Sequence, residues 1–158
     1  MAGATLEALV GKRLRTLKQR LVTAESCTGG LIAHRLTNIS GSSEYFVGGV
    51  VTYANDAKMA LLGVRAETLA TQGAVSEAVA REMAEGARRR FAADHSVACT
   101  GIAGPGGGSP EKPVGLVYIG VAGPGGTRAE RCQFQGDRMS IKQQTADRAL
   151  ALLLEALR

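Results

Sequence analysis

The sequence has no tryptophan, and aromatic residues of all kinds make up only 4% of its 158 residues. Proteins that bind single-stranded nucleic acid stack bases on such side chains, so this scarcity argues against a nucleic-acid partner. No apolar run is long enough to cross a membrane, and the first twenty residues interleave apolar residues with Lys and Arg, unlike the core of a signal peptide. We therefore expect a cytoplasmic protein with no membrane partner.

Cysteine and histidine are also scarce. The three cysteines, Cys27, Cys99 and Cys132, are far apart, and no CxxC pair occurs among them. This pattern indicates neither a disulfide framework nor a zinc site. With only two histidines, a histidine-based metal site is not expected either. The sequence therefore predicts a protein that uses no metal and no cofactor.

What is present is an ordinary globular composition with a basic excess. Hydrophobic residues make up 45% and charged residues 21%, and the length fits a single domain over residues 1–158. The net charge of +5 would suit nucleic acid or a small anionic substrate. Many of the basic residues, such as Arg88 to Arg90, fall in helical patterns, where a solvated helix face explains them.

Helical and strand patterns alternate along the chain. Apolar spacing, caps and β-branched runs predict helices at residues 4–19, 31–36, 55–62, 77–91 and 137–158, one further turn at 67–70, and strands at 21–25, 45–53, 96–100, 114–122 and 129–134. Asn55 and Ser76 are the expected N-caps of two of these helices. The alternation, followed by a strand pair, predicts an α/β fold: a three-layer α/β/α sandwich with a mixed, mostly parallel sheet.

Ligands of open α/β sheets bind where strands end and helices begin. The first such point is AESCTGG, residues 24–30, which reads as a strand that breaks into a helix. Free amides at a helix N-terminus favour an anion or a developing oxyanion, and Gly29 and Gly30 allow close approach of the backbone. A hydroxyl that only caps the helix, with glycines that only serve packing, would produce the same pattern.

The second point is VTYANDAK, residues 51–58, where Tyr53 and Lys58 flank a strand-to-helix turn. A buried lysine loses its proton more readily because burial penalises the charged form. The neutral amine can then take a proton from a serine hydroxyl, as in the Ser-Lys variants of the catalytic triad. A surface lysine on a short helix is the simpler alternative.

The third point is CTGIAGPGGGSPEKPVG, residues 99–115, which is rich in glycine and proline. A rigid loop of this composition offers amides to a phosphate, and Lys112 adds a positive charge. A flexible linker fits the composition equally well. Taken together, the three segments predict an amide or acyl hydrolase that acts on a phosphorylated small molecule.

Seven motifs occur in the order typical of one family: TAESCTGG at 23–30, GSSEYF at 41–46, TYANDAK at 52–58, GAVSE at 73–77, TGIAGPGGG at 100–108, KPVG at 112–115 and GDR at 136–138. The chain therefore resembles the CinA C-terminal domain, the nicotinamide-nucleotide amidohydrolase (NMN deamidase, PncC) family. The resemblance implies hydrolysis of nicotinamide mononucleotide (NMN) to nicotinate mononucleotide and ammonia, a step of pyridine nucleotide recycling. It also implies a metal-free Ser/Lys dyad and the stand-alone form of the domain.

The resemblance assigns the nucleophile to Ser26 and the base to Lys58, with Tyr53 orienting Lys58 or relaying its proton. The family often has serine where Ala54 stands here. Ser42, Ser43 and Cys27 are the competing nucleophiles.

The substrate would lie among residues of the three segments, with its phosphate against the loop at 101–108 and with Lys112 or Arg138 as cationic partner. The expected substrate-binding residues are Glu25, Cys27, Thr28, Gly29, Gly30, Thr100, Gly101, Gly104, Gly106, Lys112 and Arg138. We also expect a homo-oligomer, by analogy with domains of this size. The alternative function is a non-catalytic module that binds nucleotides or nucleic acid and is linked to competence or DNA damage.

Overall fold

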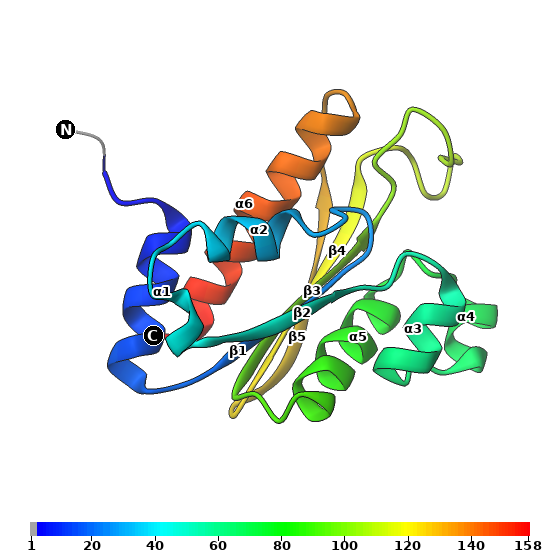
Figure 1. The fold of residues 1–158 in the computed structure, drawn as a ribbon. Coiled ribbons are helices and arrows are strands. Elements are labelled where there is room, and N and C mark those ends of the chain that lie inside the picture. Colours follow the sequence, from blue (N-terminus) through cyan, green and yellow to red (C-terminus); the bar gives the residue numbers. More distant parts are fainter. Residues whose placement is uncertain (1–2) are drawn as a thin grey trace.

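The computed structural model describes residues 3–158. Figure 1 shows how helices and strands alternate along this part of the chain. The helices are α1 (Leu6–Leu17), α2 (Leu31–Thr37), the short 3-10 helix η1 (Ser42–Glu44), α3 (Asn55–Leu62), α4 (Ala66–Gln72), α5 (Glu77–Arg90) and α6 (Arg138–Ala156). The strands are β1 (Leu21–Glu25), β2 (Phe46–Val51), β3 (His95–Gly101), β4 (Leu116–Gly123) and β5 (Gly126–Gln133). Among these described residues, no helix is long and apolar enough to span a membrane.

The strands form one sheet in the order β2-β1-β3-β4-β5. Strand β1 is parallel to both of its neighbours, whereas β4 is antiparallel to both β3 and β5. Within residues 3–158, β4 is therefore the single strand that runs against the others, and the predicted mixed, mostly parallel sheet is confirmed. Glu25 lies level with Val51 on one side and Cys99 on the other, so the first three strands end together at one edge of the sheet.

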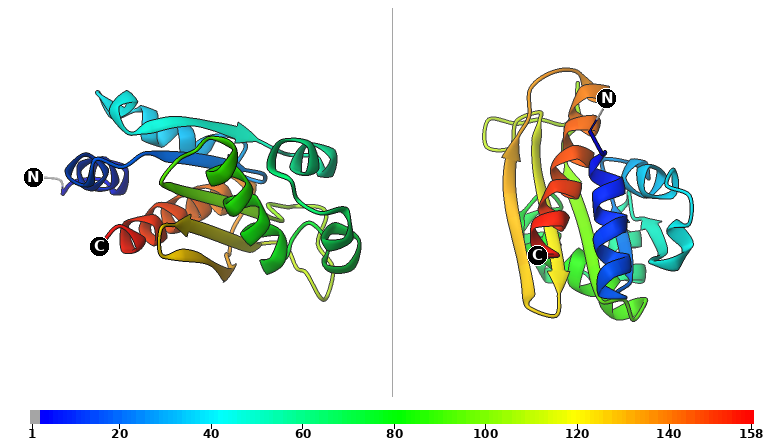
Figure 2. Two further views of the ribbon diagram at one scale, coloured as in Figure 1. Left: turned by 90° about the horizontal axis from the view of Figure 1, so that it is seen from below. Right: turned by 90° about the vertical axis from the view of Figure 1, so that its left-hand side faces the viewer.

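Helices cover both faces of this sheet, which makes the predicted three-layer α/β/α sandwich (Figure 2). One core cluster joins the sheet to α1, α2 and α6, and the other joins it to α3, α4 and α5. Successive strand residues point to opposite faces. Accordingly, Val97 and Cys99 belong to the first cluster and Ala98 to the second.

Local sequence explains most element ends. Ser76 caps α5 by accepting a hydrogen bond from the amide of Val79, as predicted. The cap of α3 differs from the prediction: it is Ala54, which offers no side-chain hydrogen bond, so that Asn55 is the first residue of the helix. Strand β5 begins at Gly126 rather than Ala129, because Gly123 pairs with Gly126 across a two-residue turn.

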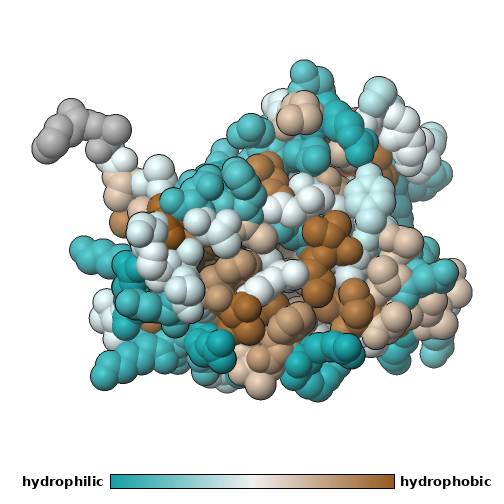
Figure 3. All heavy atoms as spheres, viewed as in Figure 1, coloured by the Kyte–Doolittle hydropathy of each residue, from teal (hydrophilic) through white to brown (hydrophobic). Residues whose placement is uncertain are grey.

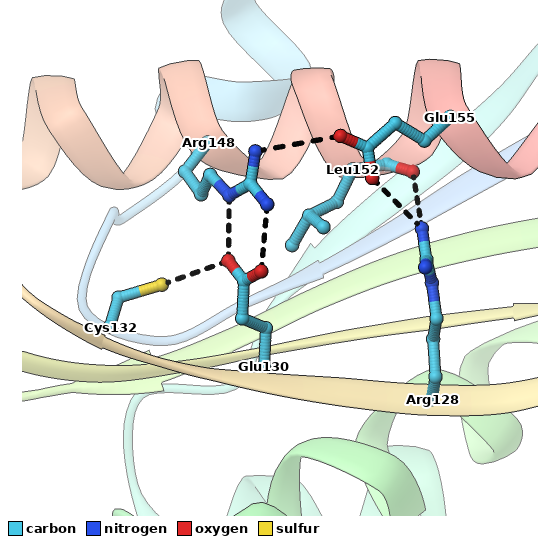
Figure 4. Close-up of polar contacts among 6 residues, drawn as sticks. All are labelled: Arg128, Glu130, Cys132, Arg148, Leu152 and Glu155. Carbon is cyan, nitrogen blue, oxygen red and sulfur yellow. Dashed lines mark hydrogen bonds and ion pairs between the residues drawn. The ribbon is translucent and has the colours of Figure 1, made fainter.

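A network of charged side chains attaches the second half of α6 to the edge strand β5 (Figure 4). Arg148 donates to both carboxylate oxygens of Glu130, at 2.6 and 2.7 Å, and these bonds hold the pKa of Glu130 below its usual range. Arg148 and Arg128 both reach Glu155, at 3.7 and 3.3 Å. Because α6 is held in this way at its far end, its first turn has a defined place at the carboxyl edge of the parallel strands.

Candidate active site

Ser26 and Lys58 meet at this edge of the sheet. Ser26 follows directly after β1, where its amide donates to the carbonyl of Cys99 on the neighbouring strand. Lys58 comes from α3, which begins just after β2 ends. The Lys58 Nζ lies 3.0 Å from Ser26 Oγ, and the two residues are only 1% and 8% exposed. The two side chains that the sequence predicted as a dyad therefore share one buried place.

The surroundings of Lys58 combine hydrogen-bond acceptors with burial. Its Nζ donates to the carbonyls of Thr52, at 2.8 Å, and Tyr53, at 3.1 Å. Within residues 3–158 no carboxylate pairs with it, and burial lowers the pKa of the amine. Nζ donates to Ser26 Oγ as well as to the two carbonyls. Once the amine has lost one proton, the two carbonyls can accept its two N–H bonds, and the lone pair then faces the Ser26 hydroxyl.

Glu25 and Thr28 lie beneath the turn that carries Ser26, and the structure does not bring them to a position where a substrate could reach them. The Glu25 carboxylate accepts hydrogen bonds from the Thr28 hydroxyl and from the amides of Ile32, at 2.8 Å, and Ala33, at 3.0 Å. These bonds occupy the buried carboxylate and satisfy amides at the start of α2. Glu25 was expected to contact the substrate, but in the structure its carboxylate fixes the turn instead.

The competing nucleophiles are less well placed. Cys27 is buried next to Ser26, and its hydrogen bond to Cys99, together with burial, raises the pKa of the Cys27 thiol well above its usual range. A thiol that stays protonated is a poor nucleophile. Ser42 and Ser43 belong to η1, which precedes β2 and therefore lies at the opposite edge of the sheet from Ser26.

A pocket of about 180 Å³ opens in front of Ser26. It is lined by Ser26, Cys27, Tyr53, Asn55, Lys58, Ala74, Val75, Thr100, Gly101, Ala103 and Arg138. The hydroxyl of Thr100 donates to the carbonyl of Ala74, at 2.8 Å, and so attaches the loop before α5 to the end of β3.

Some of these lining residues were missed from the sequence. Asn55 was interpreted as a helix cap, although it stands at the strand-to-helix junction that carries Lys58. Ala74 and Val75 belong to the GAVSE motif, which was a usable signal. Among residues 3–158, no cluster of three or more His, Cys, Asp or Glu side chains could hold a metal ion.

Tyr53 and Arg138 form the mouth of the pocket. Arg138, the first residue of α6, donates from Nη2 to the Tyr53 hydroxyl at 2.9 Å and from Nη1 to the carbonyl of Gly104 at 2.8 Å. The Tyr53 side chain is 59% exposed. Its phenol therefore faces Arg138, and Tyr53 contacts Lys58 through its main-chain carbonyl instead of through the expected side chain.

Most of the glycine-rich loop stays away from the pocket. Gly101 lines it, and Gly104 contributes only the carbonyl that Arg138 contacts. Gly106 lies in a separate exposed depression, and Lys112 donates its ammonium to the carbonyl of Gln72 at 2.6 Å. Gly29 and Gly30 form the turn after Ser26 in left-handed conformations, φ +62° and +107°. The structure thus brings neither Gly106 nor Lys112 to the nucleophile.

Comparisons with known proteins agree with this architecture. A family model described as "CinA C-terminal domain" matches residues 3–157. A CinA-like protein of Syntrophobacter fumaroxidans is 52% identical over 152 residues, which are 96% of this chain and 36% of that protein. The chain thus spans about a third of the length of the curated relatives that it matches.

Two solved structures are similar over nearly their whole length. The competence/damage inducible protein CihA of Agrobacterium tumefaciens superposes with a TM-score of 0.90 at 47% identity, and the match covers 99% of this chain and 98% of that one. A CinA superfamily protein of Klebsiella pneumoniae gives a TM-score of 0.92 at 39% identity, with 96% and 95% covered.

Proposed function

We propose that this chain, which belongs to the CinA C-terminal domain family, hydrolyses the carboxamide of NMN to give nicotinate mononucleotide and ammonia. The observation that carries the proposal is the buried contact of 3.0 Å between Lys58 Nζ and Ser26 Oγ. The names of the relatives are CinA-like protein or refer to competence and damage, and they state no reaction. The choice of NMN is supported by the seven ordered motifs and by the chemistry of the pocket.

In the proposed first step, the neutral amine of Lys58 takes the proton of Ser26 as Oγ attacks the carboxamide carbon. The amide of Cys27, which lines the pocket, makes no hydrogen bond within the described structure, which leaves it as a donor for the developing oxyanion. One donor of this kind contributes roughly 3 kcal/mol to the stability of a transition state. The positive pyridinium ring assists the attack by withdrawing electrons from the carboxamide.

In the second step the tetrahedral species breaks down. Lys58, now charged, returns its proton to the departing nitrogen, which leaves as ammonia, and an ester between Ser26 and the nicotinoyl group remains. Water then attacks this ester while Lys58 accepts a proton from it. As the ester bond breaks, Lys58 gives this proton to Ser26 Oγ, which regenerates the serine and the neutral amine and releases nicotinate mononucleotide. Lys58 thus serves as base and acid in turn, which requires an amine that changes charge easily inside the pocket.

The size of the pocket suits one end of the substrate. Its volume of about 180 Å³ is below the roughly 300–1,000 Å³ that encloses a whole drug-sized ligand. We therefore place the pyridine ring and carboxamide inside, beside Ser26, and the ribose and phosphate towards the mouth at Tyr53 and Arg138.

The test is a Ser26→Ala variant assayed for ammonia release from NMN, with nicotinamide and NAD in parallel. We expect turnover of NMN to fall by about 10³-fold or more, because the nucleophile is lost, with an unchanged circular dichroism spectrum. Ser43→Ala is the matched control, since it removes a hydroxyl at the other edge of the sheet, and it should keep wild-type activity. Undiminished turnover by Ser26→Ala would remove Ser26 from the mechanism.

The rival function is a binding module for nucleotides or nucleic acid, favoured by the net charge of +5 and by relatives named after competence and damage. It predicts no ammonia release and binding to DNA that weakens steeply with salt. The amidase predicts turnover that changes little with the charges at the end of α5, where Arg88 to Arg90 lie far along the chain from Lys58 and Ser26.

A further inference from the structure

We propose that Lys142, together with Arg138, holds the phosphate of the substrate and makes the site prefer a mononucleotide over the corresponding riboside. This inference rests on the proposed function of the Ser26 pocket. It moves the expected phosphate position from the glycine-rich loop to the first two turns of α6.

Lys142 lies on the same side of α6 as Arg138, because the two residues are four positions apart. Long side chains on a helix lean towards its N-terminus. The ammonium of Lys142 therefore extends towards the turn of Arg138, which lines the pocket mouth. It also reaches the turn that follows the nucleophile, since Nζ lies 3.6 Å from the position that a Cβ would take on Gly29.

The Lys142 ammonium has no counter-ion among residues 3–158. It takes part in none of the ion pairs of the described chain, and the positions one turn before and after it (138, 139, 145 and 146) carry no acidic residue. The carboxylate of Glu25, which underlies the same turn, is occupied by Thr28 and two amides. The Lys142 side chain is only partly exposed, and its unpaired ammonium is available to a bound anion at this place.

Arg138 retains capacity for the same anion. Its guanidinium has five N–H donors, of which Gly104 and Tyr53 accept two. The remaining donors suit phosphate oxygens, for which arginine offers two parallel bonds. Lys112, the cation expected from the sequence, is held instead by the carbonyl of Gln72. With the carboxamide at Ser26, the substrate would therefore extend along α6 instead of along the glycine-rich loop.

The experiment compares NMN with nicotinamide riboside, which lacks the phosphate, in the wild type and in Lys142→Met. We expect the ratio of kcat/KM for NMN to kcat/KM for the riboside to fall about tenfold or more, mainly through the KM for NMN, because one charge-assisted contact is lost. Lys142→Arg should restore most of the ratio. Lys112→Met removes a lysine of the glycine-rich loop and should leave the ratio at the wild-type value.

Two results would overturn the inference. One is an unchanged ratio in Lys142→Met, which includes an equal loss on both substrates, since an equal loss indicates a structural role. The other is a fall of the ratio in Lys112→Met in its place. Calorimetric titration of NMN and the riboside into Ser26→Ala and Ser26→Ala/Lys142→Met separates this inference from the proposed function. If the wild type releases no ammonia but NMN affinity still depends on Lys142, only the amidase proposal fails.

Discussion

A fully buried lysine is rare unless a charged partner accompanies it. Lys58 has two carbonyls and a serine hydroxyl around its amine. Burial lowers the pKa of this amine, whereas a paired carboxylate would have kept the proton in place. The residue chemistry of the pocket thus depends as much on the missing acid as on the lysine itself.

The protonation of Lys58 should appear in the pH dependence of the reaction. Burial lowers the pKa of this amine from its ordinary value of about 10.4. Below the lowered pKa the charged amine cannot accept the proton of Ser26, so kcat/KM should rise with pH through that value and then level off. Steady-state rates of ammonia release between pH 5 and pH 10 would show this rise of kcat/KM on the acid side of the profile.

Lys58→Arg provides the control for that profile, because its guanidinium stays charged over the whole range. We expect it to be inactive throughout, with thermal unfolding still cooperative. An arginine variant with wild-type turnover, or a wild-type profile without an acid limb, would assign Lys58 to substrate binding and not to proton transfer.

At the level of single residues, the sequence predicted which residues belong to the site better than it predicted where their side chains point. Ser26 and Lys58 follow from motifs at strand ends, and the structure brings them together. The Tyr53 phenol and the Lys112 ammonium were expected inside the site, yet they contact Arg138 and the carbonyl of Gln72. Their directions depend on α6 and on α4, which are remote in sequence, so local patterns could not reveal them.

The meeting of Ser26 and Lys58 depends on how three elements pack. The turn after β1 places the serine, α3 places the lysine, and α5 packs against α3. Helices α3 and α5 approach closely at Gly86, where a Cβ would collide with the carbonyl of Leu62, the last residue of α3. This glycine therefore determines how closely α3 packs against α5, and with it the position of the Lys58 amine.

Gly86→Ala should reduce stability and activity together. We expect a loss of about 1–3 kcal/mol in the free energy of unfolding, typical of overpacking, because the new methyl group displaces α3. The NMN kcat should also fall, since Lys58 moves with the helix. Urea denaturation and ammonia-release assays measure the two effects.

Gly125→Ala is a suitable comparison, because a Cβ there meets no atom within 4 Å. It should leave both quantities near their wild-type values. If Gly86→Ala kept full activity at the same stability, the close contact between α3 and α5 would not control the position of Lys58.

The elements themselves were largely predictable, but some of their ends were not. Strong apolar spacing and caps identified α1, α5 and α6 from the sequence. The hairpin turn is tighter than predicted, and α4 is longer than the single turn expected at 67–70. Both differences arise from pairing and packing with other elements, which outweigh local preference.

For the whole molecule, the three-layer fold follows from the alternation of helices and strands, whereas the strand order does not. Ser26, Lys58 and Thr100 line one pocket because β1 lies between β2 and β3 and is parallel to both. Other orders satisfy the same alternation and would separate Ser26 from Lys58. Convergence of the site was therefore a hypothesis at the level of sequence, and only the topology brings the segments together.

The outermost strand of the sheet, β2, bears on the oligomeric state. Strand β2 is an edge strand of sequence FVGGVV, without a charge or proline to discourage pairing. Figure 3 shows apolar side chains on the face along which β2 runs in Figure 1. Val51 on this strand is 49% exposed, and Leu61 on α3 is 36% exposed. We predict a homo-oligomer that uses this edge.

Sedimentation velocity at micromolar concentration measures this prediction. Val51→Lys should shift the protein towards the monomer, because a buried charge opposes pairing at the edge. Leu9→Lys, on α1 and similarly exposed at 37%, should sediment like the wild type. A wild-type monomer would contradict the prediction.

The attachment of α1 to α6 has a consequence for fusion. Arg13 donates to the carbonyl of Leu157 at 2.6 Å, which holds the last turn of α6 against the first helix. Figure 1 shows both ends of the described chain on the side remote from α3 and α4. A second module or an affinity tag joined at either end would therefore extend away from α3 and leave the entrance of the Ser26 pocket open.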